Sequence, residues 1–63
     1  MQQNNAKQGI QDVYDRLVTC MDTLNQSLSS AEKEENKQRI KNTLGAIDNA
    51  IEITNNALAN YRD

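Results

Sequence analysis

Apolar residues recur at intervals of three and four along two segments of this chain, and this spacing leaves few folds open to it. In the first segment the large apolar residues Ile10, Leu17, Leu24 and Leu28 fall on one side of a helical wheel. Five further residues share that side: Ala6, Val13, Tyr14, Cys20 and Met21. In the second segment one stripe contains Ile40, Leu44, Ile47, Ile51, Thr54, Leu58 and Tyr61. Each segment is therefore predicted to be an amphipathic helix whose apolar stripe packs against another helix.

The predicted helices span residues 5–28 and 30–61. Together they form a single domain over residues 1–63, with residues 1–4 expected to be disordered. Ser29, followed three residues later by Glu32, has the form of a capping box that opens the second helix. So short a connection permits only an antiparallel αα-hairpin, and the fold class is therefore all-α.

Gly45 is the residue most able to interrupt the second helix, because a glycine inside a helix costs about 0.5–1 kcal/mol relative to alanine. It could also end the helix directly after Leu44. The apolar stripe nevertheless continues from Leu44 to Ile47 without a change of phase, and no turn-forming residues surround the glycine. The pattern favours an unbroken helix with at most a bend at Gly45.

The chain is short enough to need help in forming a stable core. Domains of about this size commonly rely on disulfides, a metal ion or a partner chain. The single cysteine cannot close a disulfide within the chain, and without histidine the usual zinc sites cannot be built from one copy. Association of several copies is the expected source of stability.

A second stripe on the second helix marks where such association is expected. It consists of Ala46, Ala50, Ile53 and Ala57, and it widens the apolar arc to about half of the helix circumference. One neighbouring helix can cover only part of such an arc, and alanines allow a further helix to approach closely. The second helix is therefore predicted to contact more than one other helix.

The predicted pairing of the two helices leaves a mismatch at each end of the hairpin. It places Ile10 near Ile51 and Leu24 opposite the side chain of Lys37, while Leu58 extends beyond most of the first helix's stripe. A second hairpin with its turn at the opposite end would cover both defects by a two-fold operation. The expected assembly is a four-helix bundle or a higher helical oligomer, with an interface formed by Leu24, Leu28, Ala46, Ala50, Ile53, Ala57, Leu58 and Tyr61.

No combination of residues indicates catalysis. Histidine, the commonest general base, is absent, and Cys20 lies on the apolar side of its helix, where a thiol is expected to pack as a small apolar side chain. Asp12, Asp15 and Asp22 share a helix face but lack the ligand spacing of calcium loops or di-iron bundles. The chain is expected to be no enzyme and to hold no cofactor and no metal ion.

Basic residues gather near the start of the second helix. Lys37, Arg39 and Lys41 follow one another at intervals of two, and Arg62 lies near the other end. These four residues could bind a small anionic ligand or an acidic partner. The methylene stems of Lys33 and Lys37 could instead lie over leucines of the first helix, with the ammonium groups in water. Both interpretations are open from the sequence.

Charge and hydropathy exclude some classes of partner. A net charge of −2 argues against nucleic-acid binding, because proteins that bind phosphate backbones usually carry a basic excess. No stretch approaches the roughly 18–20 apolar residues of a membrane span, and the N-terminus lacks the pattern of a signal peptide. The expected location is the cytoplasm, without membrane contact.

These features favour an interaction protein. The leading hypothesis is a small adaptor, regulator or inhibitor that acts as a homo-oligomer and binds another protein. The alternative is an oligomer that sequesters a small anionic ligand such as a nucleotide. The predicted architecture also resembles that of plasmid copy-control RNA-binding proteins of the Rop type, in which short hairpins pair into four-helix bundles. That resemblance implies RNA binding as a third function, and it extends to no individual residue of this sequence.

Overall fold

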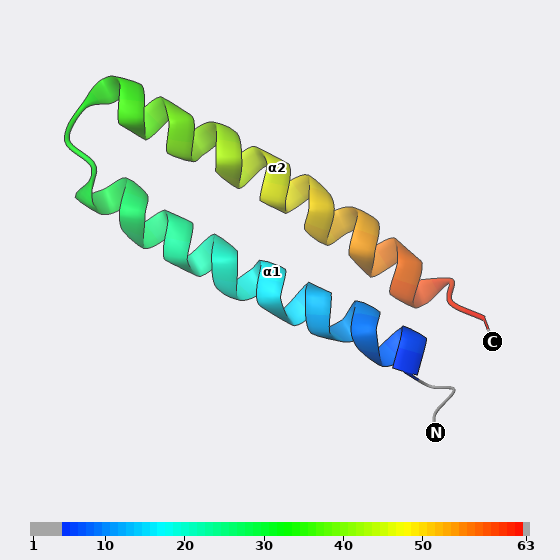
Figure 1. The fold of residues 1–63 in the computed structure, drawn as a ribbon. Coiled ribbons are helices and arrows are strands. Elements are labelled where there is room, and N and C mark those ends of the chain that lie inside the picture. Colours follow the sequence, from blue (N-terminus) through cyan, green and yellow to red (C-terminus); the bar gives the residue numbers. More distant parts are fainter. Residues whose placement is uncertain (1–4, 63) are drawn as a thin grey trace.

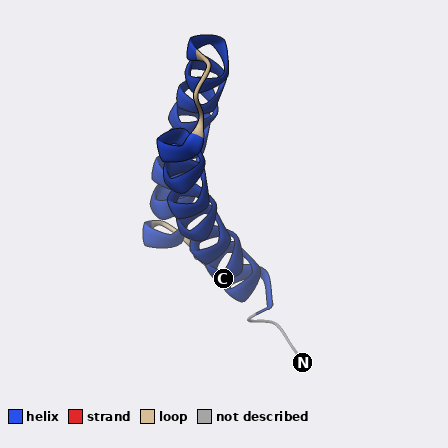
Figure 2. Cartoon of the chain, turned by 90° about the vertical axis from the view of Figure 1, so that its left-hand side faces the viewer, coloured by secondary structure: helices blue, strands red, loops and turns tan. Residues whose placement is uncertain are grey.

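The computed structural model describes residues 5–62 of the chain, and its fold is an antiparallel αα-hairpin (Figure 1). Helix α1 spans Asn5–Ser30 and helix α2 spans Glu34–Ala59. The helices stay together over their length, with the connection at one end (Figures 1 and 2). The all-α hairpin predicted from the sequence is confirmed. The predicted disorder of residues 1–4 lies outside the described residues.

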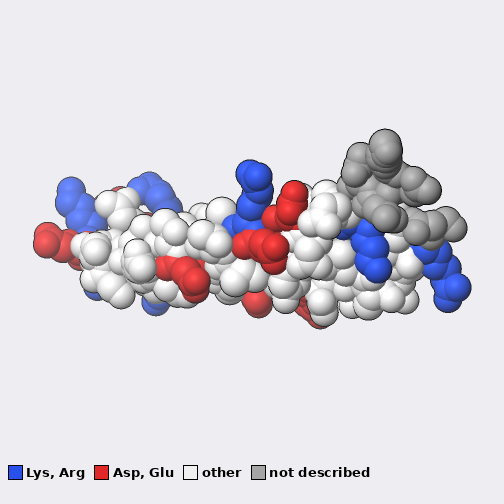
Figure 3. Space-filling model, turned by 90° about the horizontal axis from the view of Figure 1, so that it is seen from below, with Lys and Arg blue, Asp and Glu red and all other residues white. Residues whose placement is uncertain are grey.

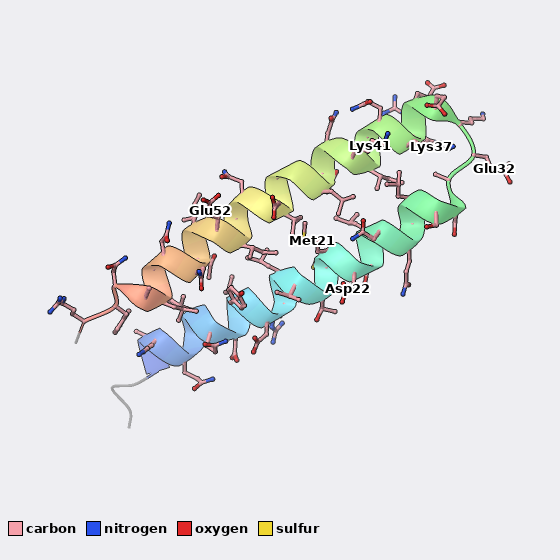
Figure 4. The ribbon with its side chains drawn as sticks, turned by 180° about the vertical axis from the view of Figure 1, so that it is seen from behind. Met21, Asp22, Glu32, Lys37, Lys41 and Glu52 are labelled. Carbon is pink, nitrogen blue, oxygen red and sulfur yellow. The ribbon has the colours of Figure 1, made fainter. Side chains whose placement is uncertain are left out.

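The helices pack through one line of half-buried side chains from each, which we call the contact stripes. The stripe of α1 is Ile10, Tyr14, Leu17, Met21, Leu24 and Leu28. The stripe of α2 is Lys37, Ile40, Leu44, Ile47, Ile51, Thr54 and Leu58, continued by Tyr61 beyond the helix. Both advance by alternating steps of three and four residues, which keeps them facing each other. Figure 4 shows Met21 pointing between the helices and Asp22 and Glu52 pointing away.

The contact stripe of α1 differs from the predicted one at Val13 and Cys20. Val13 is 49% exposed and Cys20 is also exposed, whereas the adjacent Tyr14 and Met21 are half-buried. The larger side chains of Tyr14 and Met21 thus occupy the contact. The prediction that Cys20 packs in the core is wrong for this hairpin.

The connection between the helices is longer than predicted, and the capping box does not form. The hydroxyls of Ser29 and Ser30 donate to the carbonyl oxygens of Asn25 and Gln26, each at 3.3 Å, so both serines belong to α1. A hydroxyl bonded one turn back along its own helix cannot also cap the next helix. The N-cap of α2 is Lys33, whose backbone is extended (φ −85°, ψ 136°) and whose side chain makes no capping hydrogen bond.

Helix α2 ends two residues earlier than predicted, at Ala59. The backbone N–H and the side-chain Nδ2 of Asn60 both donate to the carbonyl oxygen of Asn56, at 3.1 and 2.9 Å. The N–H of Tyr61 donates to the carbonyl oxygen of Leu58 at 3.4 Å, a bond that spans three residues. The tightened last turn ends the helix while keeping these terminal groups hydrogen-bonded.

The later start of α2 changes which residues face each other. Ile10 lines a surface groove together with Thr54, where Ile51 was predicted. Leu24 lines a second groove together with Ile47, further along α2 than the predicted lysine. Leu24 thus borders a groove that also contains an apolar side chain of α2, while Lys37 remains half-buried in the contact stripe near the turn.

The hairpin is long and thin, and it encloses no core of its own. Its radius of gyration is 14.8 Å, compared with about 11 Å for a compact domain of this length. Correspondingly, no residue in the described part of the chain is fully buried. The contact stripes remain partly open to solvent along both sides of the molecule.

Helix α2 runs through Gly45 without interruption, which confirms the prediction of a continuous helix. A Cβ atom added at Gly45 would meet nothing within 4 Å. The glycine is therefore not required by any close contact in the hairpin.

Replacing Gly45 by alanine is expected to raise the free energy of unfolding by about 0.5–1 kcal/mol, because alanine loses less backbone entropy when the helix forms. Urea denaturation followed by circular dichroism, at one fixed protein concentration, measures this change. If Gly45→Ala instead lowered the free energy of unfolding by about 0.5–1 kcal/mol or more, the position would need glycine and the helix would not be regular there.

A candidate interaction surface

The contact stripes leave two exposed flanks, one on each side of the hairpin. In an antiparallel pair, equivalent heptad positions of the two helices lie on the same side. Val13 of α1 and Ala57 of α2 occupy equivalent heptad positions, each directly before a contact-stripe residue, and they line the same groove together with Ile53. The helical angle of each residue outside the contact stripes then assigns it to one side of the hairpin or the other.

One flank contains no Asp or Glu among the described residues, and we call it the acid-free flank. Its members are Ala6, Gly9, Val13, Arg16, Cys20, Thr23, Ser27, Asn36, Arg39, Thr43, Ala46, Ala50, Ile53 and Ala57, all of them exposed except the half-buried Ala50. Val13 is 49% exposed and Ile53 is 60% exposed. Exposed apolar side chains that lie together in one patch are typical of an interaction site, and Val13 and Ile53 line one groove.

The opposite flank carries five of the seven acidic residues of the helices, and we call it the acidic flank. Its charged residues are Asp15, Asp22, Glu34, Lys41, Asp48 and Glu52. Val18, which is 40% exposed, is its one large apolar residue among those described. The two sides of the hairpin therefore differ in chemistry although both helices contribute to each.

Two shallow grooves run along the acid-free flank, where the contact stripes are incompletely covered. The first is lined by Ala6, Gly9, Ile10, Val13, Ile53, Thr54 and Ala57, and the second by Thr19, Cys20, Thr23, Leu24, Thr43 and Ile47. The only polar side chain in the first groove is that of Thr54. Its hydroxyl donates to the carbonyl oxygen of Ala50 at 2.7 Å, so this groove presents an almost wholly apolar surface.

The predicted interface residues fall into two groups of four. Those on the acid-free flank are Ala46, Ala50, Ile53 and Ala57. Those half-buried between the helices of the same chain are Leu24, Leu28, Leu58 and Tyr61. The second group therefore packs within the hairpin, as Ala50 does in part, whereas Ala46, Ile53 and Ala57 are exposed and are placed to meet another molecule.

The basic residues predicted as a binding cluster do not share one surface. Lys37 is in the contact stripe of α2, Arg39 is on the acid-free flank and Lys41 is on the acidic flank. Arg62 follows the end of α2, and that end lies about 27 Å along the helix from Lys41. Figure 3 likewise shows Lys and Arg side chains spread over the length of the molecule. Neither of the two grooves described above is lined by any of these four residues.

Lys37 lies partly against the hairpin, as its stem was predicted to do, whereas Lys33 is exposed. The side chain of Lys37 is 36% exposed, and its Nζ atom lies 3.6 Å from Oε2 of Glu34. Because the Glu34 carboxylate is 89% exposed, this ion pair contributes little to stability. Packing of the lysine stem is the more important role.

The contribution of α1 to the acid-free flank was missed in the sequence. Val13 and Cys20 were assigned to the contact with α2, and Ala6 with them. The sequence nevertheless indicates this part of the flank, because Ala6, Val13, Cys20 and Ser27 share one heptad position and none of them is acidic. Their spacing of seven keeps all four near one line of the helix surface, with a drift of about 20° per heptad.

Within residues 5–62, no three His, Cys, Asp or Glu side chains are close enough together to hold a metal ion. Neither helix of the described chain has a stretch sufficiently long and apolar to cross a membrane. Comparisons with protein-family models, with curated proteins and with solved structures found no match.

Substitutions at Lys37 separate packing from charge. Lys37→Met is expected to leave the free energy of unfolding unchanged or to raise it by up to about 1 kcal/mol, because methionine keeps an unbranched stem. Lys37→Asp is expected to lower it by about 1–3 kcal/mol, since a short carboxylate would face the leucines of α1. Lys41→Asp, at an exposed position, should change it by less than about 0.5 kcal/mol.

Urea denaturation of the three variants at equal protein concentration provides the comparison. Equal losses in Lys37→Met and Lys37→Asp would mean that the charge, and not the stem, matters at this position.

Proposed function

We propose that this chain is a non-enzymatic interaction protein that acts as a homo-oligomer and presents a helical surface to another protein. The acid-free flank is the observation that carries the proposal. It exposes Val13 and Ile53 on the side of the hairpin from which the acidic residues of both helices are absent.

The energetics of the hairpin support association. Complete burial of a large apolar side chain contributes about 1.5–3 kcal/mol, and the hairpin alone buries none of its described side chains fully. Covering the acid-free flank would remove Val13 and Ile53 from water and close the grooves over Leu24 and Ile10. Stability and association are then linked, because the same surface serves both.

The acidic flank supports the second half of the proposal, the binding of another protein. It would remain outside an oligomer that buries the acid-free flank. Asp15, Asp22, Asp48 and Glu52 would then surround the exposed Val18 on a helical surface. Such a surface complements a partner with basic residues around an apolar contact.

No observation favours the two other functions considered from the sequence. Sequestration of a small anion would need several donors around one groove, and Lys37, Arg39 and Lys41 lie on three different sides of α2. The RNA-binding function rested on architecture alone. We therefore propose neither.

A matched pair of aspartate substitutions tests the proposed assembly. Ile53→Asp is expected to weaken association by roughly 10- to 100-fold. Each factor of ten in affinity corresponds to about 1.4 kcal/mol, and burying an unpaired carboxylate costs more than that. Val18→Asp should associate as the wild type does. Val18 is 40% exposed and Ile53 is 60% exposed, so a greater effect at Ile53 cannot come from folding of the hairpin itself.

Sedimentation equilibrium and thermal melting at several protein concentrations measure the effect. The melting temperature of the wild type and of Val18→Asp should rise with concentration, since association stabilises the folded chain. A wild type that sediments as a compact monomer at tens of micromolar, with a melt independent of concentration, would contradict the proposal.

A further inference from the structure

We infer that a second copy of the chain covers the acid-free flank with its own acid-free flank, and that both turns lie at the same end of the resulting four-helix bundle. The inference rests on the proposed homo-oligomer and specifies its contact surface and orientation. It differs from the opposite-end arrangement expected from the sequence. The distribution of side chains along the acid-free flank, rather than the predicted mismatch at the two ends, decides the orientation.

Two symmetric arrangements can bring the acid-free flanks of two hairpins face to face. A two-fold axis parallel to the helices places α1 of one copy on α2 of the other, with both turns at one end. A two-fold axis across the helices places α1 on α1 and α2 on α2, with the turns at opposite ends. In both cases the interface is made by the same patch on each copy.

The distribution of side chains along the acid-free flank distinguishes the two arrangements. The half nearer the chain termini is apolar or small except for the central Arg16, and it contains Ala6, Gly9, Val13, Ala50, Ile53 and Ala57. The half nearer the turn is mostly polar and contains Thr23, Ser27, Asn36, Arg39 and Thr43, with Cys20 and Ala46 near the middle of the flank. Turns at the same end bring apolar half onto apolar half, whereas turns at opposite ends bring apolar half onto polar half. Burial of apolar surface therefore favours the same-end arrangement.

The position of Arg16 gives an independent reason. Helix α1 runs from Asn5 to Ser30, so Arg16 lies within about 3 Å of its midpoint along the axis. The opposite-end arrangement stacks the two α1 helices about that midpoint and brings two like charges together. The same-end arrangement places Arg16 over Ala46 and Ala50 of the other copy, where its stem has room and its guanidinium can reach water.

The area of the flank is sufficient for a stable dimer. Each helix of 26 residues is about 39 Å long and about 10 Å wide. Two such helices side by side give the hairpin a face of about 780 Å². Stable protein complexes bury about 800 Å² on each partner. The small residues Gly9, Ala46, Ala50 and Ala57 allow the helices to approach closely over this area.

The same-end dimer leaves both acidic flanks on the outside, on opposite faces of the bundle. Each copy thus offers Val18 and its surrounding carboxylates to a partner. The dimer would accordingly bind two partner molecules, or two sites of one partner, in equivalent ways.

The distance between the two turns tests the inference. Glu32 is exposed in the connection between the helices, and Glu32→Cys in a Cys20→Ser background provides a single site for a nitroxide spin label. Pulsed electron paramagnetic resonance should give an inter-chain distance below about 25 Å for turns at the same end, given helix separations of about 10 Å. Turns at opposite ends would give about 40 Å, the length of the helices.

Two controls make the outcome decisive. The labelled protein must sediment as the wild type does, and dilution with excess unlabelled chain must remove the dipolar signal if it arises between copies. A distance near 40 Å in a protein that sediments as an oligomer would overturn the same-end arrangement and leave the proposed homo-oligomer intact. A monomer without dipolar signal at tens of micromolar would overturn both.

Discussion

The packing of one contact stripe from each helix is the interaction on which the structure depends. Two helices can cover only one side of each other. The alternating spacing of three and four therefore fixes which residues are shielded, and the rest of each helix surface stays in water. Ile10, Leu17 and Leu24 on α1 meet the isoleucines and leucines of α2 only as half-buried side chains. A hairpin of this kind gains less from apolar burial than a domain with an enclosed core.

Because one hairpin buries little apolar surface, the composition of its two exposed flanks decides where further burial can occur. Acidic residues are absent from the flank that exposes Val13 and Ile53, and they crowd the flank that exposes Val18. Desolvating unpaired carboxylates is costly, so their absence keeps one side free to be covered by apolar packing. We propose that this side is where the hairpin completes its core with a second copy, while the acidic flank is left for another protein.

The sequence allowed the hairpin to be predicted because apolar periodicity continues through both helices and Gly45 does not change its phase. The phase of α1 could not be settled in the same way. Val13 and Tyr14 are adjacent apolar residues, as are Cys20 and Met21, and either member of each pair continues a repeat of three and four. Likewise, the hydroxyl of Ser29 could bond forward as a cap or backward to Asn25, and the structure has the second. The alanines and Ile53 on α2 were identifiable as a surface stripe, whereas the part of the acid-free flank on α1 depends on the phase that remained ambiguous.

The reactivity of Cys20 with iodoacetamide, measured over a range of protein concentrations, tests the central claim most directly. Cys20 is exposed in the hairpin and belongs to the acid-free flank, so a second copy seated there would shield its thiol. Alkylation, followed by mass spectrometry, should slow as the protein concentration rises, while Ile53→Asp should keep the faster rate of the dilute wild type. A wild-type rate that is independent of concentration and equal to that of Ile53→Asp would contradict the claim that this flank is covered.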